Sequence, residues 1–157
     1  MRIPFSIRPV GTAAFDVVGF GLNSIDLVGV VKEFPESNTK QRLRRFAQLP
    51  GGQIATAMVV CARLGWKARY LGRFGDDAFG RAARESLEKE GVNLEGARSI
   101  PGATNQFAMV LVDERTGERT VLWHRHEGLT TDPDEIDASA IGSGRRSPAS
   151  CSSRCCA

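Results

Sequence analysis

The sequence PGGQIATAMVVCARLGWKARYLGRFGDDAFG, residues Pro50–Gly80, contains the clearest structural pattern of this chain. After a glycine pair, apolar residues at helical spacing predict a helix over residues 53–64, and a buried strand follows over 68–74. A second glycine-rich turn then opens another predicted helix over 77–90, with an aspartate as its N-cap. The first turns of such helices present free backbone N–H groups, which can bind hydroxyl, carboxylate or phosphate groups.

The residues before this pattern predict further strands. Residues 15–21, FDVVGFG, form a short apolar run that is typical of a buried strand in a parallel sheet. We expect residues 22–26 to form a loop at the C-terminal end of that strand, where open α/β sheets usually bind their ligands. Residues 27–31 and 41–48 indicate exposed or edge strands around a turn.

A β-hairpin is predicted in the second half of the chain. Residues 106–113 and 118–124 are both rich in β-forming residues, and the four residues between them, ERTG, are typical of a turn. Alternating β and α units followed by a hairpin predict an α/β protein, in which a parallel core carries a small accessory sheet.

The composition is that of an ordinary globular protein with a single domain. The chain has 157 residues, of which 41% are hydrophobic and 25% are charged, and its formal net charge is +3. So small a charge does not predict a nucleic-acid partner, and no apolar run approaches the ~20 residues that span a membrane. We therefore expect a cytoplasmic protein with no membrane partner, which begins with a disordered lead-in over residues 1–14.

The last residues break the pattern. Residues 132–141 predict a short helix, but residues 142–157, GSGRRSPASCSSRCCA, contain no Val, Ile, Leu, Met or aromatic residue. They are either a natural flexible tail or the product of a departure from the true reading frame near Gly144, and we expect the second. The three cysteines of residues 145–157 have no further ligands that would complete a metal site.

Four segments, in this order and spacing, resemble the N-terminal half of the PfkB-type, ribokinase-like carbohydrate kinases. They are VVGFGLNSID (17–26), PGGQIATAMVVCARLG (50–65), GRFGDDAFG (72–80) and FAMVLVDERTGERTVLWH (107–124). The resemblance extends over about residues 15–144 and implies a doubly wound α/β core with a small β-sheet lid. It also implies transfer of the γ-phosphoryl group of ATP, with Mg²⁺ as cofactor, to a hydroxyl of a small sugar.

The resemblance also implies roles for individual residues. Asp26 would accept hydrogen bonds from two sugar hydroxyls, because a carboxylate is a strong acceptor. Gly51 and Gly52 would let the sugar approach the backbone closely, and Asn23 would add a polar contact. Further residues are assigned to sugar binding or to the lid: Thr56 to the sugar, and Phe107, Arg119 and Trp123 to the lid.

Two departures from the family pattern affect the expected activity. Thr56 stands where the family usually has an asparagine, so this position has lost the reach of an amide. The family signature D-T-x-G-A-G-D, which supplies the catalytic aspartate and the anion hole, does not occur in the sequence. We therefore assign no catalytic residue and no nucleotide site to this chain, and expect it to be truncated and inactive alone.

Two other interpretations remain open, and a metal site is not predicted. A dinucleotide-binding domain fits poorly, because Ser24 occupies the third glycine position of a G-x-G-x-x-G motif that starts at Gly19. The second interpretation is a non-catalytic module that binds a sugar or forms a homodimer through the lid sheet. A metal pair at His124 and His126 would need a third ligand that the sequence does not supply, and we predict no metal site.

Overall fold

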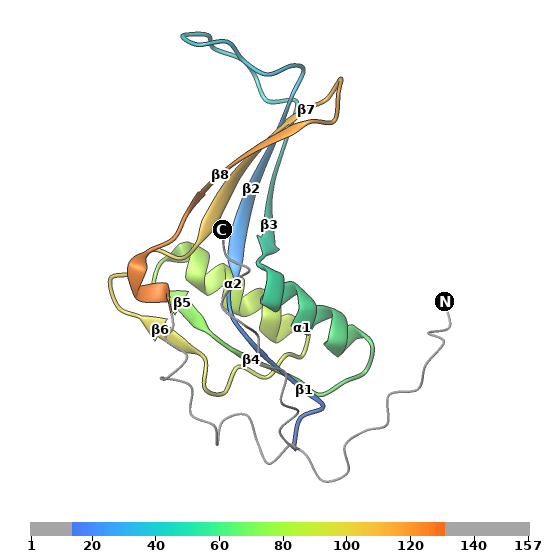
Figure 1. The fold of residues 1–157 in the computed structure, drawn as a ribbon, viewed down its shortest axis with the longest axis vertical. Coiled ribbons are helices and arrows are strands. Elements are labelled where there is room, and N and C mark those ends of the chain that lie inside the picture. The colour runs from blue at the N-terminus through green and yellow to red at the C-terminus, as the bar shows by residue number, and fades with distance from the viewer. Residues whose placement is uncertain (1–13, 131–157) are drawn as a thin grey trace, which may run out of the picture.

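The computed structural model describes residues 14–130, which form a small α/β core and a long four-stranded sheet that extends away from it (Figure 1). Two short parallel pairs of strands and two helices make up the core. These elements are β1 (Val17–Phe20) with β4 (Ala68–Leu71), β5 (Arg73–Gly75) with β6 (Arg98–Ile100), α1 (Gln53–Arg63) and α2 (Ala78–Lys89).

The long sheet, called the lid sheet below, has the strand order β3-β2-β7-β8. Its central strands, β2 and β7, run parallel, and each pairs antiparallel with an edge strand. After β8 the chain returns to the core through a single 3₁₀ turn, η1. The bounds of these elements are β2 (Ser24–Val31), β3 (Arg45–Gly51), β7 (Phe107–Asp113), β8 (Arg119–His124) and η1 (Glu127–Leu129).

The core packs around two aromatic side chains of consecutive strands. Tyr70 and Phe74 are fully buried, and their rings meet edge to face with centroids 5.6 Å apart. Met58 of α1 and Leu87 of α2 belong to the same cluster. Both helices therefore bury one apolar stripe against the strands, as the helical spacing of the apolar residues predicts.

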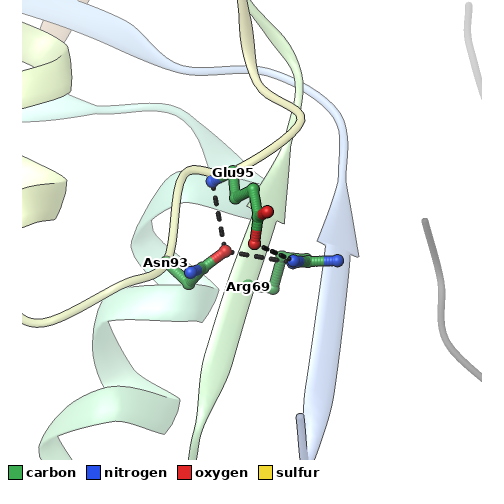
Figure 2. Close-up of polar contacts among 3 residues, drawn as sticks. All are labelled: Arg69, Asn93 and Glu95. Atoms are coloured by element: carbon green, nitrogen blue, oxygen red, sulfur yellow. Dashed lines mark hydrogen bonds and ion pairs between the residues drawn. The ribbon is translucent and has the colours of Figure 1, made fainter. Parts of the chain in front are cut away.

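Polar contacts fix the loop that follows α2. The Arg69 side chain on β4 donates from Nε to Asn93 Oδ1 (3.0 Å) and from Nη2 to Glu95 Oε2 (2.7 Å), as Figure 2 shows. The backbone N–H of Glu95 donates to the same Asn93 oxygen at 3.1 Å. This network lies on the core strands and has a structural role, because it joins β4 to the chain that leads into β6.

A second arginine anchors the chain where it leaves the lid sheet. The Arg73 guanidinium on β5 donates to the carbonyl oxygens of Gly128 and Thr130, both at 2.9 Å. Leu129 between them is buried. The C-terminal base of the lid sheet is therefore attached to the core by β5.

Most of the predicted elements are confirmed. Both helices lie where the spacing places them, and Asp77 caps α2 by accepting a hydrogen bond from the Gly80 N–H at 2.8 Å. The hairpin of β7 and β8 is also present. Among the described residues, no helix is long and apolar enough to cross a membrane.

Three expectations about strands are wrong. Residues 22–26 do not form a loop throughout, because β2 already begins at Ser24 and includes Asp26. The strand is also central in the lid sheet and not an edge, since β3 and β7 flank it. Residues 68–74 divide at Gly72 into β4 and β5, which belong to different pairs.

The division falls at Gly72, where a Cβ atom would lie 2.2 Å from the Tyr70 hydroxyl. The short strand β6 was not predicted from the sequence. Of the expected lead-in over residues 1–14, all but the last residue lie outside the described residues, as do the expected helix over 132–141 and the tail over 142–157.

Candidate functional site

A groove of about 670 Å³ lies between one face of the lid sheet and the N-terminal end of α1. Because side chains alternate along a strand, every second residue of β2, β7 and β8 faces it. We call this the inner face of the lid sheet. The lining of the groove includes Ser24, Asp26, Gly52, Gln106, Trp123 and Arg125.

Asp26 is the one carboxylate in the lining of the groove. It lies on β2, opposite Leu49 of β3 and Ala108 of β7. Its Oδ1 atom accepts a hydrogen bond from the Ser24 hydroxyl at 2.9 Å, and within residues 14–130 the carboxylate has no other hydrogen bond or ion pair. A carboxylate offers about four lone-pair sites, so most of its accepting capacity is directed to a ligand or to solvent.

The glycine pair joins the lid sheet to α1. Gly51 ends β3 opposite Ser24, and Gly52 is the N-cap of α1 with φ 94°. A Cβ atom at Gly51 would lie 2.6 Å from Asp26 Oδ2, and one at Gly52 would lie 2.5 Å from the Cα atom of Asn23. A side chain at Gly51 would therefore displace the Asp26 carboxylate, whereas one at Gly52 would meet the backbone.

Asn23 is not in the lining of the groove and instead lines a second cavity, of about 200 Å³. Its side chain is buried, and its Nδ2 atom donates to the Tyr70 hydroxyl (3.0 Å) and to the carbonyl oxygen of Arg73 (2.8 Å). The Tyr70 hydroxyl in turn donates to the carbonyl oxygen of Gly21 at 2.7 Å. Burial raises the pKa of Tyr70 to about 12, against an opposing effect of the hydrogen bond from Asn23. The amide thus supports the turn that leads into β2.

The structure does not bring all the predicted residues together. Arg119 and Trp123 line the groove with Asp26 and Gly52. Thr56 lines the second cavity, between α1 and α2, together with two other predicted residues, Asn23 and Gly51. Phe107 has the opposite orientation in β7, and its ring packs on Phe79 and His124, each with centroids 5.6 Å apart.

Ser24, Gln106 and Arg125 are among the residues of the groove that were not predicted from the sequence. Ser24 precedes Asp26 by two positions, so it shares the inner face once β2 is recognised as a strand. Gln106 and Arg125 flank β7 and β8 at the base of the hairpin, and the Arg125 Nε atom donates to Gln106 Oε1 at 2.8 Å. Pairing the two predicted strands in register would have placed them side by side.

The two histidines beside this pair make separate contacts. The His124 ring packs against Phe107, whereas His126 Nδ1 accepts a hydrogen bond from the Gly128 N–H at 3.1 Å and caps η1. Among residues 14–130 there is no group of three His, Cys, Asp or Glu side chains that could hold a metal ion.

Known proteins of one family are similar to this chain in sequence. The sequence model described as "pfkB family carbohydrate kinase" matches residues 14–146. The chain belongs to this family. It is 30% identical over 131 residues to a probable fructokinase-4 of Arabidopsis thaliana, which covers 82% of this chain and 39% of that protein. It is 33% identical over 125 residues to an ATP-dependent ribose-1-phosphate kinase of Halopiger xanaduensis, covering 80% of this chain and 42% of that protein.

A solved structure confirms the ribokinase-like fold. The ribokinase of Thermotoga maritima superimposes with a TM-score of 0.61 at 26% sequence identity, over 69% of this chain and 35% of that one. The chain thus spans about two fifths of the length of the curated family members described above. The four-stranded lid sheet and the two shorter strand pairs all lie within that length.

Proposed function

We propose that this chain is the sugar-binding part of a PfkB-type sugar kinase, and that the groove beneath the lid sheet is the sugar site. The carbohydrate kinases among its relatives support this proposal. The observation that carries it is the Asp26 carboxylate, which faces the groove and uses only one of its acceptor sites within the described residues. Two neighbouring sugar hydroxyls could donate to the remaining lone pairs.

The glycine pair and the lid sheet would complete the site. The backbone at Gly51 and Gly52 carries no side chain, so a sugar ring can approach the start of α1. Across the groove, Val121 and Trp123 present exposed apolar surface on which the nonpolar face of a sugar ring can pack. The relatives have names that specify different sugars, and their names alone do not select one for this chain.

The full reaction would be ATP-dependent phosphoryl transfer to a sugar hydroxyl, which depends on positioning and on stabilisation of charge. Asp26 is the one carboxylate of the groove, which is too few oxygen ligands to assign Mg²⁺ to this site. We therefore derive no step through ATP or Mg²⁺ for the described residues. In this proposal the chain binds sugar but does not transfer phosphate by itself.

The direct test is sugar binding by the whole 157-residue chain. Isothermal titration with D-fructose and D-ribose should give saturable binding, and Asp26→Asn should weaken it about tenfold or more, since hydrogen bonds to charged groups are the strong ones. Glu114→Gln is the matched control, because it removes an exposed carboxylate outside the groove. Stabilisation of the protein by NAD and not by sugars would contradict the proposal. ATP-dependent phosphorylation of a sugar by this chain would contradict the part of the proposal that limits the chain to binding.

We also propose that the chain forms a homodimer through the lid sheet, and a second observation supports this. Its outer face, opposite the groove, exposes Phe46, Met109 and Leu122. Each of these residues has more than half of its surface accessible to solvent. The register places Met109 directly opposite Leu122, and Phe46 opposite Gly29. Contiguous apolar surface of this kind is typical of a protein–protein interface, and a second copy of this chain would cover it.

A further inference from the structure

The base of the groove carries a row of polar side chains. Ile25 pairs with Phe107, and Phe107 pairs with His124. The residues next to these at the base of the sheet, Ser24, Gln106 and Arg125, therefore lie side by side. All three line the groove, and the backbone N–H of Ile25 donates to the Gln106 carbonyl at 3.1 Å. Asp26 lies in the next row of the same face. The row is therefore part of the proposed sugar site.

Arg125 is held in this row by a neutral partner. Its Nε atom donates to the Gln106 side-chain oxygen at 2.8 Å, and its guanidinium carbon lies 5.5 Å from the centroid of the Trp123 ring. Within residues 14–130, no carboxylate lies within 4.0 Å of the guanidinium nitrogens, since Arg125 takes part in none of the ion pairs found there. The amide fixes the orientation of the guanidinium group but leaves its charge unneutralised.

This arrangement leaves the outer edge of the guanidinium group available. With Nε bonded to Gln106, the two terminal nitrogens retain their N–H donors in the fork geometry that fits a carboxylate or a phosphate group. Arg125 is half-buried, and a ligand bound above it would remove more water from the guanidinium group. Enclosing an unpaired charge is costly, whereas an anionic ligand would compensate it.

The charges around the groove favour the same kind of ligand. Its charged lining residues are Asp26, Arg119 and Arg125, so the two arginines outnumber the single carboxylate. We propose that Arg125 binds an acidic group of the ligand, and that this chain therefore takes a sugar acid or a sugar phosphate in preference to a neutral sugar. The inference rests on the proposed sugar site. In that site Asp26 accepts from hydroxyls at one side of the ligand, and Arg125 binds its carboxylate or phosphate group at the other.

The experiment compares matched ligands on the whole 157-residue chain by isothermal titration. The pairs are D-glucose with D-gluconate and D-ribose with D-ribose 5-phosphate, and inorganic phosphate alone is a third probe. We expect the charged member of at least one pair to bind about tenfold more tightly than its neutral partner. A preference for gluconate alone identifies a carboxylate as the acidic group, and a preference for the phosphate ester alone identifies a phosphate.

Three variants assign the preference to Arg125. Arg125→Gln should abolish it. Gln106→Glu should also abolish it while keeping the arginine, because the new carboxylate would neutralise the guanidinium group. Arg115→Gln removes the same charge at the far end of the hairpin, outside the groove, and should leave the preference unchanged. Melting temperatures of all three variants show that the fold is retained.

The outcomes separate this inference from the proposed function. Equal binding of neutral and charged sugars would overturn the inference and leave the sugar site standing. Binding of inorganic phosphate as tight as that of the sugar phosphate would also overturn it, since the anion would then bind without the sugar. If none of the sugars binds, both the inference and the proposed function fail.

Discussion

Gly51 and Asp26 are in contact across the β2–β3 pair, and their contact leaves no room for a side chain at Gly51. A Cβ atom there would lie 2.6 Å from Asp26 Oδ2 and 3.0 Å from its carboxyl carbon. The obstacle is the end of a side chain, which can move, and not the backbone. The requirement for glycine at this position therefore comes from the position of the carboxylate that faces the groove.

We predict that Gly51→Ala weakens sugar binding while the protein stays folded. The methyl group would displace the Asp26 carboxylate from its contact with Ser24, and the hydroxyls of the sugar would lose a placed acceptor. The affinity measured by isothermal titration should fall about tenfold or more, because the sugar hydroxyls would lose hydrogen bonds to a charged group. Unchanged affinity in a variant that melts at the wild-type temperature would contradict this role of Gly51.

Gly52→Ala is the contrasting variant, and it should act on stability. Gly52 has φ 94°, and its Cβ atom would lie 2.5 Å from the Cα atom of Asn23 and 2.7 Å from the Leu22 carbonyl oxygen. Both obstacles are backbone atoms, and the left-handed conformation alone costs about 1–2 kcal/mol for a residue with a Cβ atom. Urea denaturation should therefore show a larger loss of stability for Gly52→Ala than for Gly51→Ala.

Tyr70 should make the stability of the protein sensitive to alkaline pH. Its pKa is raised to about 12, whereas an unfolded tyrosine has a pKa of about 10. The stabilising contribution is complete below pH ~10, and it falls as the pH rises from ~10 to ~12 because the unfolded chain loses this proton first. Tyr70 is the single tyrosine of the sequence, so its ionisation can be followed by absorbance at 295 nm.

Tyr70→Phe provides the matched comparison. It removes the donor to the Gly21 carbonyl and the acceptor for Asn23, which should cost about 1–3 kcal/mol at neutral pH. The variant should also lose less stability than the wild type between pH ~10 and ~12. A phenol that titrates near pH 10 in the folded protein, or an equal alkaline loss in both proteins, would show that the hydroxyl is not buried in this network.

The dimer proposal predicts that charge on the outer face separates the subunits. Leu122 is 63% exposed there, beside Met109, and Leu122→Lys would place an ammonium group in the interface. Sedimentation equilibrium should show a dimer for the wild type and at least an about tenfold weaker association for the variant. Val60→Lys on α1 is the control, since Val60 is also half-exposed but lies outside the lid sheet. A wild-type protein that is monomeric at high concentration would contradict the proposal.

How much of the structure the sequence predicts depends on the distance between the interacting residues. The helices follow from local spacing, and the Asp77 cap follows from its own first turn. The central place of β2 in the lid sheet does not follow from local spacing, because it depends on pairing with β7, which is distant in the sequence. The apolar and polar alternation of a strand gives its faces but not its neighbours.

The same distinction applies to the candidate site. Asp26 and the glycine pair belong to sequence motifs, and the structure brings them together. Arg125 carries no motif, and its position becomes meaningful only once the hairpin register sets it beside Gln106. The role of Thr56 was inferred from a motif position, but that turn of α1 faces the cavity toward α2.

The far end of the lid sheet should loosen in acid through Asp113. Desolvation alone would raise the pKa of this carboxyl, but hydrogen bonds from the Thr116, Arg115 and Phe34 backbone N–H groups outweigh it and lower the pKa. These bonds, at 3.0, 2.9 and 3.3 Å, fasten the β7–β8 turn and the chain after β2 to one side chain. With a lowered folded pKa, the stabilisation is present above the unfolded pKa of about 4 and is lost as the pH falls through the folded value.

Amide hydrogen exchange measured from pH 6 down to pH 3 tests this expectation. Protection at Phe34, Arg115 and Thr116 should decline together at the acid end, whereas the amides of the buried core strand β4 should keep theirs. Asp113→Asn should show low protection of the same three amides already at pH 6, because a neutral amide oxygen is a weaker acceptor than a carboxylate. Glu114→Gln changes the neighbouring, exposed carboxylate and should leave the pH profile unchanged. If the wild-type amides of this turn stay protected at pH 3, the carboxylate form of Asp113 does not hold the two loops together.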